Sequence, residues 1–169
     1  MLDFLFRRLT AEPNRGTELF GAVTALARRP HWYVEGRVPD TLDGRFAVLA
    51  TVAALVIVRL ESEGERGERV SVALTERFIE VMESEHRELG LGDPTLGKTV
   101  RKLVGSLARR TELWRSAAVA GDWTGGARAS LYKDEPGTSA VDHSAAVLEQ
   151  LWSALQRLDV STVEQGRLE

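Results

Sequence analysis

The sequence contains no cysteine among its 169 residues, and this absence excludes disulfides, thiol catalysis and cysteine-ligated metals. It has only three histidines, His31, His86 and His143, which are too widely separated for a metal-binding spacing such as H-E-x-x-H. Lysine is also scarce, because all but three of the 22 basic residues are arginine. We interpret that bias as a coding preference. The sequence predicts no catalytic residue, no cofactor site and no metal site.

The sequence also lacks an apolar run long enough to cross a membrane. Its longest uncharged run, Phe46 to Val58, lies between Arg45 and Arg59. As a helix this run covers roughly 20 Å, whereas a hydrocarbon core needs roughly 30 Å. Its β-branched end also fits a strand, but its alanines and its length favour a helix. We therefore predict an all-α, single-domain helical bundle around a buried central helix at about residues 41–62, capped by Asp40.

Composition divides the chain into three parts. Residues 1–14 form an N-terminal segment, 15–133 a helical domain, and 134–169 a linker and a C-terminal helix that packs on the bundle or extends it. The first segment lacks the cleavage pattern of a secretory signal. It fits either a first turn against the core or a small amphipathic foot on a membrane surface. Its apolar helical face comprises Leu2, Leu5, Phe6 and Leu9.

Apolar residues at helical spacing predict further helices on both sides of the central one. A polar turn at 61–68, with Gly64 and Gly67, is expected to separate the central helix from the next. The expected helices are Thr17–Arg29, Val70–Leu89, Lys98–Ala120, a short helix ending near Tyr132, and a last helix from Ser139.

The net charge of −3 hides two segments of opposite sign. Ten acidic and four basic residues give 61–97 a charge of −6, and eight basic and two acidic residues give 98–133 a charge of +6. In the second segment Lys98, Arg101, Lys102 and Arg109 share a helix face opposite an apolar stripe. Such a face can bind nucleic acid, anionic lipid or an acidic protein surface, or it can be an ordinary solvated face.

Residues 92–99 fit the P-loop pattern G-x-x-x-x-G-K-T. A P-loop needs a strand that delivers the glycine loop to a helix N-terminus, where backbone amides and the lysine bind phosphates. Here a helix is predicted before the pattern, and no alternation of strands and helices surrounds it. We therefore interpret residues 92–99 as a helix-to-helix connection, and keep nucleotide binding as a minor alternative.

Several short motifs occur in a characteristic order. They are Val38-Pro39-Asp40-Thr41, Arg45-Phe46 leading into the apolar helix, Leu89-Gly90-Leu91-Gly92-Asp93, Gly97-Lys98 and Arg101-Lys102. In this order and spacing, from about Trp32 to Tyr132, the sequence resembles the ubiquinol-cytochrome c chaperone family. It departs from the family's pattern at Ala108-Arg109-Arg110, where Tyr-Gly-Arg is expected, at Trp114, where Tyr is common, and at Ser130, where Asn is usual.

The resemblance implies a non-enzymatic assembly factor that binds newly made cytochrome b and promotes assembly of ubiquinol-cytochrome c reductase. Mitochondrial relatives act beside the ribosome, so the resemblance implies a contact with the ribosome and a transient contact with the inner membrane surface. The expected location is the bacterial cytoplasm, and no binding to DNA is expected. A general helical interaction scaffold is the alternative. The expected partner-binding residues are Gly90, Gly92, Asp93, Gly97, Lys98, Arg101, Lys102, Arg109 and Arg110.

Overall fold

The computed structural model describes residues 15–169. These residues form seven α-helices and one 3-10 helix, and they contain no β-strand. In chain order the helices are α2 (Thr17–Ala27), η1 (Pro30–Trp32), α3 (Leu42–Glu61), α4 (Gly64–Glu88), α5 (Asp93–Ala120), α6 (Trp123–Leu131), α7 (Thr138–Leu155) and α8 (Val160–Glu164). The predicted all-α fold is confirmed. The predicted amphipathic N-terminal segment lies outside the described residues.

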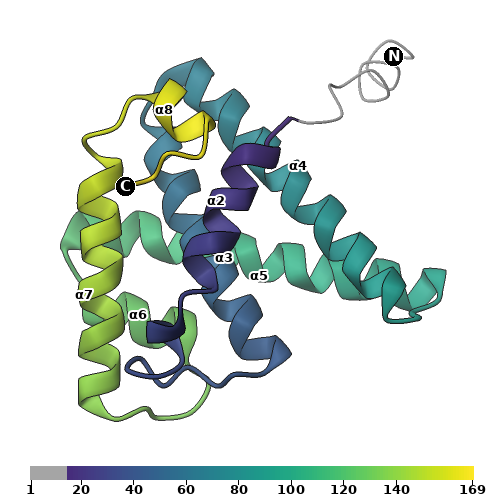
Figure 1. Cartoon of the computed structure of the whole chain (residues 1–169), viewed down its shortest axis with the longest axis horizontal. Helices are drawn as coiled ribbons and strands as arrows, with labels where there is room; N and C mark the ends of the chain where they lie inside the picture. Colours follow the sequence, from purple (N-terminus) through teal and green to yellow (C-terminus); the bar gives the residue numbers. More distant parts are fainter. Residues whose placement is uncertain (1–14) are drawn as a thin grey trace.

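Helix α3 is the centre of the bundle, as its uncharged sequence predicts. Helices α2, α4, α5, α6 and α7 all contact it (Figure 1). Val48, Val52, Leu55 and Val56 on this helix are completely buried, and burial of each such side chain stabilises the fold by about 1.5–3 kcal/mol before entropy is subtracted. Within residues 15–169, no helix combines the length and the apolar content needed to span a bilayer.

The first turn of α3 is capped by Thr41, so the predicted cap at Asp40 is wrong by one residue. The Thr41 hydroxyl accepts a hydrogen bond from the Gly44 amide at 3.1 Å. Asp40 forms an ion pair with Arg45 at 2.6 Å instead. A Cβ atom on Gly44 would lie 1.8 Å from the carbonyl oxygen of Pro39. The loop before α3 therefore lies directly on the first turn of the helix, and together they form one structural unit.

The connection between α3 and α4 is shorter than predicted, because α4 begins at Gly64 and not near Val70. Gly64 has a left-handed φ of 62° at the start of the helix, a conformation that glycine adopts without strain. A Cβ atom on Gly67 would lie 2.0 Å from the carbonyl oxygen of Leu60. The two glycines thus allow a tight reversal with close helix packing, and they do not interrupt α4.

Arg59 joins the central helix to the end of α7. Its side chain is only 6% exposed, and it donates to the carbonyl oxygens of Leu155 and Leu158, each at 2.9 Å. The Leu155 carbonyl ends α7 and accepts one backbone bond, from the Leu158 amide at 3.2 Å, and Leu158 lies in the turn that follows the helix. Glu63 pairs with the same guanidinium. Arg59, which follows the apolar run in the sequence, therefore caps the C-terminal end of α7, nearly 100 residues later in the chain.

Candidate functional site: a projecting arm and a basic groove

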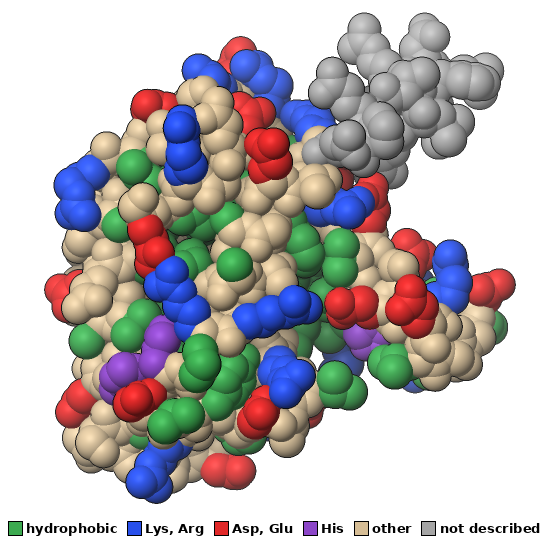
Figure 2. All heavy atoms as spheres, viewed as in Figure 1, with side chains coloured by type: hydrophobic (Ala, Val, Ile, Leu, Met, Phe, Trp, Pro, Cys, Tyr) green, Lys and Arg blue, Asp and Glu red, His purple; other side chains and the backbone are tan. Residues whose placement is uncertain are grey.

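The end of α4 and the start of α5 project from the body of the bundle and meet at a short connection (Figure 1). We call residues 83–102 the arm. On the face shown in Figure 2 the arm is covered mainly by charged side chains. Gly90, with a φ of 85°, ends α4 in the left-handed conformation. Leu89 beside it is 65% exposed, although it is large and apolar.

Helix α5 begins at Asp93, so the predicted loop at 92–99 is wrong, and most of this stretch is helical. Pro94 occupies the first turn, where its missing amide costs nothing. The Leu96 amide already bonds the Gly92 carbonyl at 2.8 Å. A P-loop presents such amides to phosphate from a loop that follows a strand. Because α4 precedes this stretch, the described structure does not favour nucleotide binding.

The basic face predicted on α5 is exposed. Lys98, Arg101, Lys102 and Arg109 all lie on the solvent side of the helix, and none of them forms an ion pair with any residue in the range 15–169. On α4, by contrast, most arginines pair with a glutamate about one turn away, as Arg87 does with Glu83. The face therefore offers positive charge that the described chain does not neutralise.

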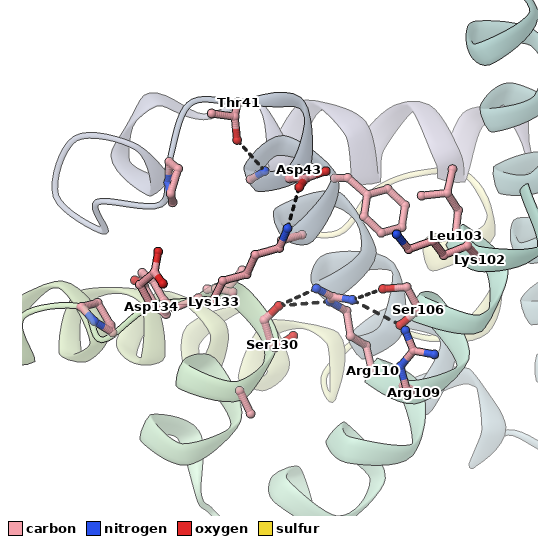
Figure 3. A pocket seen from close by; sticks show the side chains of 18 of the residues that line it. Thr41, Asp43, Lys102, Leu103, Ser106, Arg109, Arg110, Ser130, Lys133 and Asp134 are labelled. Carbon is pink, nitrogen blue, oxygen red and sulfur yellow. Dashed lines mark hydrogen bonds and ion pairs between the residues drawn. The ribbon is translucent and has the colours of Figure 1, made fainter. Parts of the chain in front are cut away.

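Beside this face lies a groove of about 740 Å³ that the sequence did not predict. We call it the basic groove. Its walls come mainly from three parts of the fold: α5 at 99–110, the start of α3 at 41–47 with the loop before it, and residues 129–136 at the end of α6 and just after it (Figure 3). His86 of α4 also lines the groove. Lys102 and Arg109 line it, whereas Gly90, Gly92, Asp93, Gly97, Lys98 and Arg101 do not.

Arg110 lines the basic groove but is used inside the protein. Its Nε and Nη2 atoms donate to the carbonyl oxygen of Ser130 at 3.1 and 2.8 Å, and Nη1 donates to Ser106 (Figure 3). Its guanidinium also lies 5.9 Å from the centre of the Phe46 ring. Burial, with the neighbouring charge of Arg109, lowers the pKa of Arg110 from its usual high value. Arg110 therefore holds α5 against the end of α6.

An exposed ion pair crosses the mouth of the groove. Lys133 donates to a carboxylate oxygen of Asp43 at 2.5 Å, which joins the segment after α6 to the first turn of α3 (Figure 3). The pair, with the nearby charge of Lys102, lowers the pKa of Asp43. Two of the three lysines, Lys102 and Lys133, thus line the groove, and Lys98 lies one turn from Lys102. Lys133 was not among the expected partner-binding residues, because it lies outside the helix that carries the basic face.

The histidine on the arm does not form a catalytic cluster. The His86 ring nitrogen Nδ1 lies 2.7 Å from the Met82 carbonyl oxygen, one turn earlier in α4. Its acidic neighbour Glu83 pairs with Arg87. Among residues 15–169 no group of three or more possible metal ligands comes together. The arrangement around the arm can bind charge and apolar surface.

The chain matches the family model described as "Ubiquinol-cytochrome C chaperone" over residues 34–159. A search of curated proteins finds no match. A comparison with solved structures finds the one described as "Crystal structure of the Cbp3 homolog from Brucella abortus", with a TM-score of 0.78 and 23% sequence identity. The match covers 98% of this chain and 94% of that chain. At this identity the likeness shows the shared fold alone.

Proposed function

The chain belongs to the ubiquinol-cytochrome C chaperone family, whose model matches residues 34–159, and on this premise we propose that its client is newly made cytochrome b. It is an assembly chaperone of ubiquinol-cytochrome c reductase, the respiratory complex III. The proposal adds that it acts without catalysis, by holding cytochrome b until the complex is assembled. The shared fold of the Cbp3 homolog supports the family assignment.

The observation that carries the proposal is the exposed positive charge on the arm. Lys98, Arg101 and Lys102 lie on consecutive turns of one helix face, with no ion pair to residues 15–169. A membrane protein held before assembly presents apolar spans and charged loops. Unneutralised cations attract acidic client surfaces at long range and orient the encounter. The projection of the arm makes this face accessible to a large client.

The tip of the arm extends the proposed contact surface to Gly90, Gly92, Asp93 and Gly97. A Cβ atom on any of these glycines would meet nothing within 4 Å, so close packing within the chain does not explain them. Only Gly90 has a φ that requires glycine. Gly97 lies inside α5, where glycine costs about 1 kcal/mol relative to alanine. A client that approaches the helix backbone closely would account for this cost.

The proposal places the protein in a bacterial cytoplasm, at the ribosome and at the inner membrane surface, because these are the sites where cytochrome b is made and inserted. It includes no contact with DNA. Sedimentation with ribosomes, and flotation with membrane vesicles, test the two contacts separately. Loss of either association after charge reversal at Lys98 and Arg101 would show that the arm makes the contact.

The experiment that tests the client is site-specific photocrosslinking in living cells. A photoreactive amino acid replaces Arg101 on the arm, and a matched control carries it at Gln150, an exposed position on α7. We expect a cytochrome b adduct from position 101 and none from position 150. A set of adducts without cytochrome b would instead indicate a general helical scaffold, and the client assignment would be wrong.

A further inference from the structure

Most of the unpaired charge that lines the basic groove is positive. The α5 wall carries Lys102 and Arg109, and Arg37 from the loop before α3 lies at the same groove. None of the three has an ion pair with residues 15–169. Lys133 and Asp43 pair with each other, so neither adds unneutralised charge to the groove. The unpaired charge on the groove is therefore mainly positive, with Lys102 and Arg109 on the α5 side and Arg37 on the α3 side.

The floor between these walls is apolar. Phe46 and Leu103 line the groove and are only partly buried. The Phe46 ring packs against Phe78, whose ring centre is 6.0 Å away, and the guanidinium of Arg110 lies over its face. A fixed aromatic surface in a half-enclosed groove can hold an apolar side chain of a ligand with little loss of its own conformational freedom.

The acidic rim distinguishes between possible anionic occupants. Asp134 is exposed, lines the groove and has no ion pair with residues 15–169, and Glu135 beside it pairs with Arg128. A nucleic acid carries a phosphate at every nucleotide, so it would bring negative charge against this rim as well as against the basic wall. A protein segment can place its few carboxylates beside the three cations and away from Asp134, which avoids this repulsion.

The volume also favours a short segment. At about 740 Å³ the groove falls within the range of roughly 300–1,000 Å³ found for ligand pockets. A groove of this size encloses a few side chains of an extended chain, and a folded domain cannot enter it.

From these observations we propose that the basic groove binds a short acidic segment of the client protein. Carboxylates of the segment pair with Arg37, Lys102 and Arg109, and an apolar side chain between them packs on Phe46 and Leu103. The inference rests on the proposed function for one point, namely that cytochrome b supplies the segment. The chemistry of the groove can be tested without it.

The probe is an array of overlapping peptides that covers the loops and termini of the cytochrome b from the same genome, incubated with the purified full-length protein. The peptide that binds most strongly is then labelled, and its affinity is measured by fluorescence anisotropy. We expect that peptide to be acidic, and we expect replacement of its Asp and Glu by Asn and Gln to weaken binding by about tenfold.

The double variant Arg37→Gln, Arg109→Gln should weaken the same peptide by about tenfold. The double variant Arg28→Gln, Arg157→Gln is the matched control, because both arginines are exposed and lie outside the groove and the arm. It should leave peptide affinity unchanged. Circular dichroism on each variant establishes that the fold is retained.

Equal binding of the acidic and amide peptides, or full affinity in the Arg37→Gln, Arg109→Gln variant, would overturn the inference. The groove would instead be assigned to RNA or to lipid under three conditions. Oligouridylate or phosphatidylglycerol vesicles would have to displace the peptide, the same double variant would have to abolish this displacement, and peptide binding would have to be independent of the peptide's carboxylates. If the photocrosslinks to cytochrome b persist while these peptide results fail, only the groove inference falls. If acidic peptides bind through the groove but no crosslink forms in cells, the client assignment fails and the chemistry of the groove stands.

Discussion

Trp114 donates its indole N–H to the hydroxyl oxygen of Ser130 at 3.2 Å inside the core. Both residues are at most 1% exposed. The Ser130 hydroxyl also lies 2.5 Å from that of Thr51 on the central helix, and Arg110 holds the Ser130 carbonyl. Two of the three places at which we expect the family to carry other residues, Tyr for Trp114 and Asn for Ser130, are therefore in contact. A larger side chain on α5 is matched by a smaller one on α6.

The contact predicts compensation between the two positions. Ser130→Asn alone should overpack the core, and Trp114→Tyr alone should leave a cavity and a changed hydrogen bond, so each should lower the free energy of unfolding by about 1–3 kcal/mol. The double variant should recover at least half of the summed loss, because the residues share one space. Urea denaturation of the four proteins measures the coupling. Additive losses would show that the two substitutions are independent.

Two helix glycines should respond in opposite directions to alanine. A Cβ on Gly126 would lie 2.6 Å from the Trp114 ring, whereas a Cβ on Gly97 would meet nothing within 4 Å. Gly126→Ala should therefore lower the free energy of unfolding by about 1–3 kcal/mol through overpacking. Gly97→Ala should raise it by about 0.5–1 kcal/mol through helix propensity. Thermal and urea unfolding measure both effects.

Gly97→Ala also tests the proposed contact at the arm. If the client approaches the backbone there, the added methyl group should reduce crosslinking to cytochrome b from position 101 although the protein is more stable. Undiminished crosslinking in this variant would mean that Gly97 is outside the contact surface.

Arg59 should be important for stability despite its position far from the proposed binding surface. Arg59→Met removes the donors to Leu155 and Leu158 and leaves Glu63 without its partner. We expect a loss of about 3 kcal/mol in the free energy of unfolding. The control is Arg66→Met, since Arg66 is exposed and lies 3.9 Å from Glu164, and it should change stability by less than about 0.5 kcal/mol. Equal effects of the two changes would contradict the capping role.

Stability should fall as pH decreases from 7.5 to 5.5. His31 Nδ1 lies 3.2 Å from His143 Nε2. Burial, followed by the charges of His143 and Arg29, lowers the pKa of His31, and Glu35 opposes this shift. The unfolded chain therefore binds a proton at His31 at a higher pH than the folded chain does. Stability is lost as pH falls from the ordinary histidine value of about 6.5 through the lower folded value.

The measurement is the urea midpoint at several values in this pH window, for the natural sequence and for His31→Gln. The variant should show a smaller decrease between pH 7.5 and 5.5. The carboxylates whose pKa is lowered, such as Asp43 and Glu169, titrate below this window. An identical pH slope in the two proteins would exclude His31 as the cause.

The fold could be predicted largely because one segment is unusual. The uncharged run at Phe46–Val58 has few ways to be buried, and only the centre of a bundle satisfies it. Local details were less determined: Asp40 and Thr41 can both cap a helix, and the choice depends on the position of Arg45. The early start of α4 was missed because Gly64 and Gly67 were interpreted as breaks, although their role depends on contacts with the preceding helix.

The candidate site could be predicted only in part. The basic face of α5 follows from periodicity, since its residues lie within one helix. The groove beside it does not, because Asp43, Arg109 and Lys133 come from three segments that meet only in the folded chain. Sequence alone also could not show that Arg110 is bound to Ser130 while Arg109 is exposed.

We propose that this protein promotes complex III assembly by binding cytochrome b through the arm. The most direct test is a reduced-minus-oxidised spectrum of membranes from cells that lack the gene. The natural gene and the triple variant Lys98→Glu, Arg101→Glu, Lys102→Glu are each returned, and immunoblotting shows that both proteins are present. We expect loss of the b-type signal of complex III, recovery with the natural gene, and little recovery with the variant. An unchanged b-type signal without the gene under respiratory growth would contradict the role in assembly, and full recovery with the variant would contradict the role of the arm.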